Sequence, residues 1–507
     1  MKLSACLKAF PTSAPVFASG KHPRIGAALS GETPVVAVIG AGFSGLMTCW
    51  NLVRNHPGSL KLVLLDPSPG RGPAYEPLSP IYVLNVPAGN MGALADQPGH
   101  FFSWLENRFP GRYQPQDFVP RQLYGDYLEE LLVQTREQAA RGPVSLEEKR
   151  ARVRRIDPRG GRIRLELDSG ESLLADRVVL ALGNQAPAHP QLENISAAEL
   201  EALPGYIQNP WRSDCLSGLD PEQPVLLLGS GLTMVDLVLG LRHRGFQGPI
   251  EAISHHARLP EPHRAKAAWP DFVAEGPAPT ELSGWLRLVR NQLDLAAEAG
   301  VDWRAVIDAL RPHTSAIWQG LSLEQRRRFM RHLRHRWTVA RHRLPAEVDA
   351  RLQTWIEDGS LRLHAGRIQG LSRSADGLQV SWLPRGGSVS ESMQVQRLIN
   401  CTGPDSNYHR LQDPLIAGLR EQGLLQPDPL SLGLQASETG ALLDSRGRPS
   451  HWLFSLGATL RGRYWESVAV PELRIQAAEL ARQLSDSLAS DSRALAGNYP
   501  SLQALVS

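Results

Sequence analysis

The apolar positions of this 507-residue chain fall into short runs that alternate with stretches at helical spacing. Residues 35–39 (VVAVI) and 225–228 (VLLL) are apolar runs, and each leads into glycines and then into a helical pattern. Two further runs, ADRVVLALG at 175–183 and VQRLINCTG at 395–403, have a polar start, an apolar middle and an end in small residues. This alternation predicts an α/β fold with two dinucleotide-binding, Rossmann-like domains.

The first glycine-rich stretch predicts a nucleotide site because every part of the binding unit occurs in order. Gly40, Gly42 and Gly45 form G-x-G-x-x-G between a strand and a helix, and Asp66 ends the next strand. The glycines allow the tight turn, the approach of the pyrophosphate and close helix–strand packing, while the acid suits a ribose hydroxyl. The helix N-terminus presents N–H groups to the phosphates. The predicted cofactor contacts are Gly40, Gly42, Ser44, Gly45 and Asp66.

The second glycine-rich stretch is less regular and suits a nicotinamide nucleotide. Gly229 and Gly231 are in place, but Met234 stands where the third glycine belongs. The following strand ends without an acid, and Arg258 lies beyond it. A carboxylate there would favour the free 2′-hydroxyl of NADH, whereas Arg258 suits the 2′-phosphate of NADPH or is a solvated loop charge, so both nucleotides stay open. The predicted contacts are Gly229, Gly231, Thr233 and Arg258.

The apolar runs that end in Gly183 and Gly403 flank this second motif. Two-domain flavoproteins have such segments where the chain crosses between their FAD and pyridine-nucleotide domains, and this likeness places both glycines at the cofactors. One site is then expected to hold FAD, and the other to bind NADH or NADPH, whose hydride passes to the flavin.

Longer segments of the sequence resemble a known family. They are GRGPAYEP (70–77), YVLNVPAGNMGAL (82–94), RQLYGDYL (121–128), GSGLTMVD (229–236), WTVARHRLP (337–345) and LGATLRGRYWESVAVPELRIQA (456–477). In this combination, over roughly 34–485, the chain resembles the bacterial FAD/NAD(P)-binding proteins that include FAD-dependent urate hydroxylases and an aspartate N-monooxygenase, with a more distant likeness to ornithine and lysine N-hydroxylases. The resemblance implies the fold and both cofactors, whereas many members have no assigned reaction.

Two of these segments are candidates for the surroundings of the flavin. Asn85 and Asn90 bracket a turn and could present amide groups to the flavin ring or ribityl chain; alternatively, they satisfy their own turn. In flavoproteins of this plan, a C-terminal helix points its N-terminus at the flavin, where its dipole favours the anion formed on reduction. The candidates at that helix are Gly457, Gly462, Pro471 and Glu472.

Several arginines stand where they could bind an anion. Arg121 precedes a helix whose Tyr124 and Tyr127 are expected in the core, and it either reaches a phosphate or substrate or forms a surface salt bridge. A helical insertion is predicted at about 269–355, with arginines on the outer faces of its basic stretch. These charges are interpreted as a solvated face that can attract NADPH or an anionic substrate, and not as a nucleic-acid site.

Composition excludes several classes of protein. The net charge is +3 and no run of about 18 apolar residues occurs, so neither a nucleic-acid partner nor a membrane span is expected. The four cysteines lack C-x-x-C spacing, which argues against a disulfide framework, a zinc site or a dithiol reductase and fits the cytoplasm. No metal site or protein-borne catalytic set is recognisable, as expected where a cofactor carries the chemistry.

The predicted organisation is an FAD domain in two parts that enclose an NAD(P)H domain. The predicted boundaries are a flexible tail at 1–33, the first FAD part at 34–215, the NAD(P)H domain with its helical insertion at 216–385, the return of the FAD domain at 386–490 and a C-terminal tail at 491–507.

The predicted function is an FAD-dependent, NAD(P)H-consuming monooxygenase that acts on a small molecule with O₂ through a flavin C4a-hydroperoxide. Urate, converted to 5-hydroxyisourate in purine degradation, is the first substrate expected, with Arg121, Arg461 or Arg341 neutralising its charge. The alternatives are an amino acid N-hydroxylating monooxygenase of the aspartate type and a non-catalytic flavin-binding redox regulator.

Overall fold

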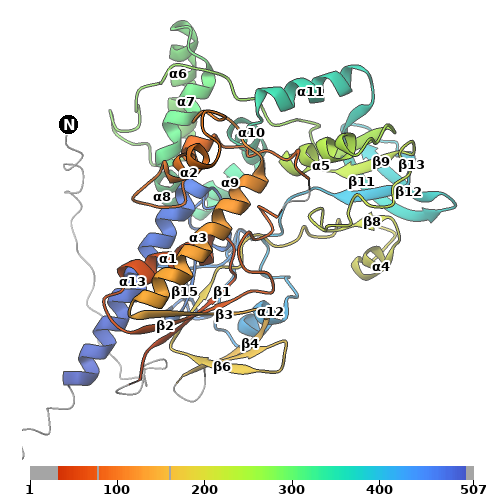
Figure 1. Ribbon diagram of the computed structural model, residues 1–507. Helices are drawn as coiled ribbons and strands as arrows, with labels where there is room; N and C mark the ends of the chain where they lie inside the picture. The colour runs from red at the N-terminus through yellow and green to blue at the C-terminus, as the bar shows by residue number, and fades with distance from the viewer. Residues whose placement is uncertain (1–31, 77–78, 159–161, 498–507) are drawn as a thin grey trace, which may run out of the picture.

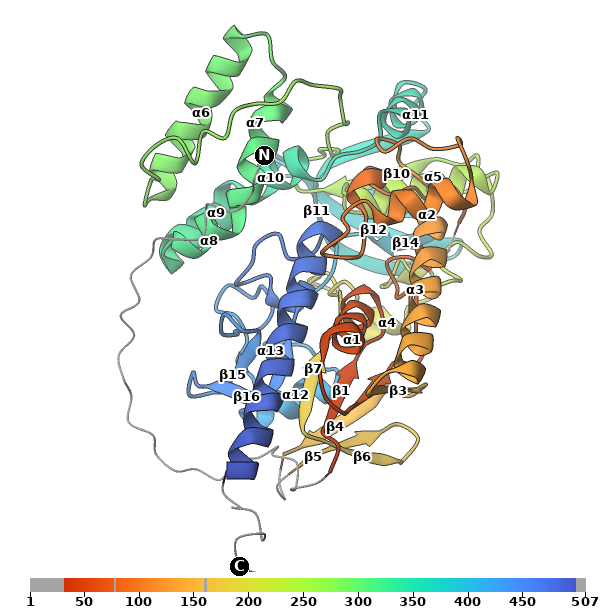
Figure 2. The same ribbon diagram turned by 60° about the vertical axis from the view of Figure 1, so that its left-hand side comes forward.

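The computed structural model describes residues 32–76, 79–158 and 162–497 (Figure 1). It contains two helix-covered β-sheets and a group of inserted helices (Figure 1, Figure 2). The predicted tail at 1–33 lies almost entirely outside the described residues. At the other end, helix α13 (Val470–Gly497) continues past the predicted boundary at 490. None of the described helices is long and apolar enough to cross a bilayer.

The first sheet contains the first glycine motif. Strand β1 (Val35–Ile39) pairs in parallel with β2 (Leu60–Leu65) on one side and with β7 (Arg177–Leu180) on the other. Both faces of β1 are buried, which accounts for its unbroken apolar sequence. The strand order is β15 (Ala441–Leu443), β16 (Pro449–Ser455), β7, β1, β2 and β3 (Val144–Lys149).

Helices cover one face of this sheet. Helix α1 (Phe43–Asn55) packs against both α3 (Arg121–Arg141) and α13. Tyr124 and Tyr127 of α3 are fully buried, which confirms their predicted place in the core. The remaining elements of this unit are α2 (His100–Arg108) and the 3-10 helix η1 (Ala88–Asn90), with α12 (Pro414–Glu421) and the small sheet of β4 (Val153–Asp157), β5 (Ile163–Leu167) and β6 (Ser172–Ala175) on the opposite side.

The centre of the second sheet repeats that of the first. Strand β9 (Val225–Leu228) has parallel neighbours β10 (Ile250–Ser254) and β14 (Arg397–Asn400), as β1 has β2 and β7. The full order is β13 (Glu391–Val395), β12 (Gly377–Pro384), β11 (Leu361–Ser374), β10, β9, β14 and β8 (Tyr206–Ile207). Helices α5 (Leu232–His243) and α11 (Ala346–Glu357) pack on one face and α4 (Ala197–Ala202) on the other.

This sheet takes residues from both sides of the boundaries predicted at 215/216 and 385/386. Strand β8 precedes residue 216, and strands β13 and β14 follow residue 385. The physical reason is that β14 completes the parallel pairing of β9, and β8 in turn pairs with β14.

The insertion predicted at 269–355 is helical. It contains α6 (Leu282–Glu298), α7 (Trp303–Leu310), the 3-10 helix η2 (Arg311–His313), α8 (Thr314–Gly320), α9 (Leu323–His332) and α10 (Arg334–Arg341), followed by α11. The basic stretch is two helices, because α9 ends at His332 and α10 begins at Arg334, with Leu333 between them. In Figure 2, α8 to α10 lie near the start of α13, while α6 extends away from both sheets.

Candidate active site

The first glycine loop has the geometry of a phosphate-binding turn. Gly40 has a φ of +102°, and a Cβ there would lie 2.3 Å from the carbonyl oxygen of Ala181, just after β7. A Cβ on Gly45 would lie 1.8 Å from the Gly40 carbonyl oxygen, so both positions require glycine. Gly42 begins α1 without a side-chain cap, and the nearest atom to its missing Cβ lies 3.6 Å away. This cradle of uncapped N–H groups fits the phosphates of a dinucleotide.

Asp66 stands beside the same loop. Its Oδ2 accepts a hydrogen bond from the Ala41 N–H at 2.8 Å, and its Oδ1 accepts one from the Ser68 N–H at 2.8 Å. The carboxylate therefore lies at the edge of the cradle, where the predicted ribose contact requires it.

The second loop repeats these contacts in the other sheet. Gly229 has a φ of +120°, and a Cβ there would lie 2.6 Å from the carbonyl oxygen of Cys401, just after β14. Gly231 begins α5 without a side-chain cap, and no atom lies within 4 Å of its missing Cβ. Met234, in the place of a third glycine, is fully buried in the core under α5. A second phosphate can approach here as at the first loop.

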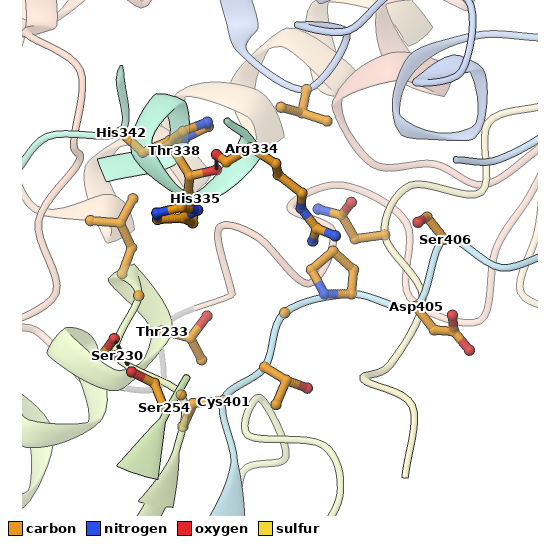
Figure 3. Close-up of a pocket in the computed structure, with 18 of the residues that line it drawn as sticks. Ser230, Thr233, Ser254, Arg334, His335, Thr338, His342, Cys401, Asp405 and Ser406 are labelled. Carbon is orange, nitrogen blue, oxygen red and sulfur yellow. Dashed lines mark hydrogen bonds between the residues drawn. The ribbon is translucent and has the colours of Figure 1, made fainter. Parts of the chain in front are cut away.

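A cavity of about 680 Å³ lies where the second glycine loop, the turns after strands β7 and β14, and the inserted helices meet (Figure 3). Gly183 and Gly403 both have positive φ and open space at the position of a Cβ, so the two small-residue turns meet at this cavity. The predicted residues that line it are Gly183, Gly229, Gly231, Thr233, Arg258 and Gly403. The other predicted contacts, Gly40, Gly42, Ser44, Gly45, Asp66, Asn85, Asn90, Gly457, Gly462, Pro471 and Glu472, do not line it.

The part of the cavity next to β10 is cationic. Ser230 Oγ donates to the carbonyl oxygen of Arg258 at 2.8 Å, which folds the loop after β10 onto the second glycine loop. The His256 and His335 rings stack with centroids 4.1 Å apart, and burial together with nearby cationic side chains lowers the pKa of both. Arg258 lines the same wall and forms no ion pair with a described residue. This end suits a phosphate group.

Gly457 links the first glycine helix to the start of α13. It begins the 3-10 helix η3 (Gly457–Leu460) with a φ of +78°. A Cβ there would lie 3.1 Å from Ser44 Oγ and 3.2 Å from a methyl carbon of Leu473. Two predicted residues, Ser44 and Gly457, therefore lie together beside the N-terminus of α13.

Gly462 and Glu472 make other contacts. A Cβ on Gly462 would lie 2.4 Å from the Asp428 carboxyl group, so packing alone requires glycine there. Glu472 forms an ion pair with Arg311 at 2.9 Å, which ties the first turn of α13 to the inserted helices. The predicted flavin contact of these two residues has no separate support in this geometry.

The asparagine turn leaves its amide groups available. Asn90 is exposed, and Asn85 is partly buried with its carbonyl oxygen 3.3 Å from His263 Nε2. Neither side-chain amide hydrogen-bonds to its own turn or to any other described residue, so the alternative of a self-satisfied turn is not what the structure has. Contact with the flavin stays a prediction.

Of the three arginines predicted to neutralise a substrate, two have carboxylate partners. Arg121 pairs with Asp236 at 2.8 Å, and Arg341 pairs with Glu466 at 3.2 Å. The Arg121 pair joins α3 to α5 and is largely buried, so it is a link between the two units and not the surface salt bridge considered from the sequence. Arg461 lines the cavity and forms no ion pair with a described residue.

The sequence patterns did not single out the face of α10 that lines the cavity. Arg334, Thr338 and His342 follow one another at four-residue spacing and carry their side chains to this wall (Figure 3). Burial lowers the pKa of His342, so its imidazole is neutral at pH 7. Leu333 and Trp337, one residue before Arg334 and Thr338, line a separate apolar cavity. The signal in the sequence was a repeat of polar side chains every four residues, with a parallel repeat of apolar side chains one position before it.

Two equivalent glycine loops, one of which opens into a cavity shared with the other unit, are the geometry of a protein that binds two dinucleotides. Residues 37–185, which contain the first loop, match a family described as FAD-NAD(P)-binding. No curated protein sequence matches the chain. The match confirms the predicted cofactors, FAD and NADH or NADPH.

Solved structures share the fold across nearly the whole chain. L-lysine 6-monooxygenase from Pseudomonas syringae is 17% identical with a TM-score of 0.63, and 90% of this chain covers 100% of that one. The reduced form of ornithine hydroxylase from Pseudomonas aeruginosa is 13% identical with a TM-score of 0.62, at 90% and 100% coverage. The FAD-bound cadaverine monooxygenase of desferrioxamine biosynthesis from Erwinia amylovora is 15% identical with a TM-score of 0.61, at 89% and 94%.

The chain therefore has the α/β fold of the FAD/NAD(P)-binding monooxygenase-like proteins, which confirms the predicted fold class and resemblance. The three similar structures are named for reactions on lysine, ornithine and cadaverine, and not on urate. Nothing in these comparisons supports urate hydroxylation.

Proposed function

We propose that the protein is an FAD-dependent monooxygenase that uses NADPH and O₂ to hydroxylate the nitrogen of a small amine, an amino acid first. The observation that carries this proposal is the single cavity onto which the second glycine loop and both small-residue turns open. The similar fold of ornithine, lysine and cadaverine hydroxylases supports an amine in place of urate.

The two loops divide the cofactors between them. The cradle at Gly42, with Asp66 beside it, would hold FAD, and the cavity wall at Gly231 would hold the nicotinamide nucleotide. Bound FAD supplies the acceptance of hydride and the activation of O₂. The residues of the chain bind, orient and enclose the reactants.

The cationic wall after β10 favours NADPH over NADH. Arg258, His256 and His335 line it, and no carboxylate stands among the residues that line this end. A 2′-phosphate would meet an arginine and two imidazoles there, whereas the 2′-hydroxyl of NADH would meet no acid that accepts its hydrogen bond.

The described cysteines argue against a dithiol reductase. Cys49, Cys215 and Cys401 are all free and buried. Burial raises the pKa of the Cys215 and Cys401 thiols, so neither is an activated nucleophile.

The test is a substrate screen on the purified holoprotein. NADPH oxidation is followed with L-aspartate, L-ornithine, L-lysine, cadaverine and urate, and the products are analysed for a hydroxylated nitrogen. We expect one of the amines to accelerate NADPH oxidation and to yield an N-hydroxylated product in proportion. If urate alone accelerates it and its near-ultraviolet absorption disappears, the proposal fails in favour of urate hydroxylation; if no compound has an effect, a flavin-binding regulator takes its place.

A further inference from the structure

The cavity contains two arginine side chains without a carboxylate partner. Arg461 follows η3, and Arg334 begins α10; both line the cavity and neither forms an ion pair with a described residue. Arg461 is partly buried, and burial lowers its pKa to about 10, with the charge of Arg334 adding to the effect. Arg334 is exposed. Because the two positive charges repel each other, an anion that contacts both guanidinium groups would stabilise the pair.

Arg461 is fixed by aromatic packing and not by hydrogen bonds. Its guanidinium carbon lies 4.7 Å from the centroid of the Trp465 ring, and that ring stacks on Trp318 at 4.8 Å. The buried Nε of Arg461 has no hydrogen-bond partner among the described residues. The N–H donors of this guanidinium group are therefore free to form planar, bidentate hydrogen bonds to a carboxylate.

The carboxylates around the cavity are already engaged. Asp405, the one carboxylate among the described residues that line it, pairs with Arg410 at 3.1 Å. Glu466 accepts from Trp337 Nε1 at 2.8 Å and pairs with Arg341. Among the described residues that line the cavity, no free acid is left to hold a second ammonium group, as a diamine would require.

The two arginines lie apart from the predicted site of the nucleotide phosphates. In Figure 3, Arg334 extends from α10 toward Asp405 and Ser406, whereas Ser230 and Ser254 lie on the far side of the cavity. Arg461 comes from the segment after Gly457, next to the first glycine helix.

Resting on the proposed function, we propose that Arg334 and Arg461 bind a carboxylate of the substrate, so that the enzyme acts on amino acids and not on simple diamines. The shared chemistry is anion binding, and a phosphate of the nicotinamide nucleotide is the competing source of that anion. The experiment separates the two sources.

Arg461→Gln, Arg461→Lys and Arg334→Gln are compared with Arg328→Gln, which alters an exposed arginine of α9 outside the cavity. The dissociation constants of succinate, a dicarboxylate without an amine, and of NADP⁺ are measured on each FAD-loaded protein from flavin absorbance. Turnover is measured with L-aspartate and cadaverine. Loss of a charge-assisted contact predicts roughly 10- to 100-fold weaker succinate binding in both Gln variants, a smaller effect in Arg461→Lys and none in Arg328→Gln.

NADP⁺ binding and NADPH-dependent flavin reduction should stay within about twofold of wild type in all four variants. Weaker NADP⁺ binding with unchanged succinate binding would assign the arginines to the nucleotide and overturn the proposal, as would wild-type protein that binds no succinate or prefers cadaverine. If no amine is turned over but succinate binding still depends on Arg461, the proposed function fails and the carboxylate site stands.

Discussion

The glycines of the two loops are needed for two different reasons, either to avoid a clash within the fold or to leave room for the ligand. Gly40 and Gly229 are closed off by the backbone of Ala181 and Cys401, so a side chain at either position strains the fold itself. Gly42 and Gly231 begin their helices with room at the missing Cβ, so a side chain there is opposed by the ligand and not by the protein. Substitutions at the second pair can therefore separate ligand binding from folding.

Gly42→Val is expected to give folded protein without bound FAD. Gly231→Val is expected to give folded protein whose FAD is still reduced by dithionite but is reduced at least about 100-fold more slowly by NADPH. In both variants the branched side chain occupies the space through which the phosphates approach the backbone. FAD content and anaerobic flavin reduction are the measurements. Gly99→Val is the matched control: Gly99 also precedes a helix with no atom within 4 Å of its Cβ position, yet it lies outside the cavity. Normal reduction of Gly231→Val by NADPH would remove the nucleotide from the second loop.

The glycine loops could be predicted from the sequence because strand, turn and helix lie within a few residues of one another. Which of the arginines is free to bind an anion could not be predicted in the same way. Arg341 is neutralised only because Glu466, far along the chain, packs beside it, and Arg461 is left free for the same reason. Which cation meets a substrate is thus decided by long-range packing.

At the scale of elements, one ion pair connects the two units. Arg121 at the start of α3 meets Asp236 of α5, and burial raises the pKa of Asp236 from 3.8 to about 6 despite the arginine. A carboxyl group whose pKa is raised in the folded state stabilises the fold at pH values below its pKa in the unfolded chain. That contribution is lost as the pH rises through its pKa in the folded protein. Between about pH 4 and 6 the loss approaches 1.4 kcal/mol per pH unit.

Asp236→Asn is therefore expected to alter the pH dependence of stability. The thermal midpoint of wild type minus that of the variant should decrease as the pH rises from about 4 to 6 and be constant above 7. Asp294→Asn, which changes an exposed aspartate of α6, is measured alongside as the control for loss of a surface charge. A difference for Asp236→Asn that does not vary with pH would mean that the Asp236 carboxyl group titrates alike in the folded and unfolded chain.

The elements themselves were predictable where the signal was local. The central strands and the helices after each glycine loop follow from apolar period and glycine spacing. Strand β14 was expected in the returning FAD segment, whereas it joins the second sheet by pairing with β9 across more than 160 residues. The break at Leu333 between α9 and α10 was not foreseen either, since both sides of it have helical sequences.

At the scale of the whole molecule, the net charge of +3 conceals an uneven distribution. The cavity wall after β10 carries Arg258 beside His256 and His335, and no carboxylate is among the described residues that line that end. Such a concave cationic surface attracts anionic ligands before contact, and salt screens that attraction.

Added salt should therefore weaken the use of NADPH more than that of NADH. From about 20 mM to about 300 mM KCl, kcat/KM for NADPH is expected to fall severalfold, and that for NADH by clearly less, because NADH lacks the 2′-phosphate. The two nucleotides serve as controls for each other, since bulk effects of salt on the enzyme act on both. Equal salt dependence would mean that the 2′-phosphate does not meet the cationic wall after β10.

Cys401, whose backbone packs against Gly229 of the second glycine loop, bears on the resistance of the protein to oxidation. Cys401 lines a cavity in which, under the proposed function, oxygen is activated and peroxide escapes whenever turnover is uncoupled. Thiolates react with peroxide and thiols resist it. Burial raises the pKa of Cys401 well above its ordinary value, and its Sγ lies 3.7 Å from the Ile399 carbonyl oxygen. Under the proposed function, this thiol therefore stands beside the oxidant in its protonated form, which peroxide attacks slowly.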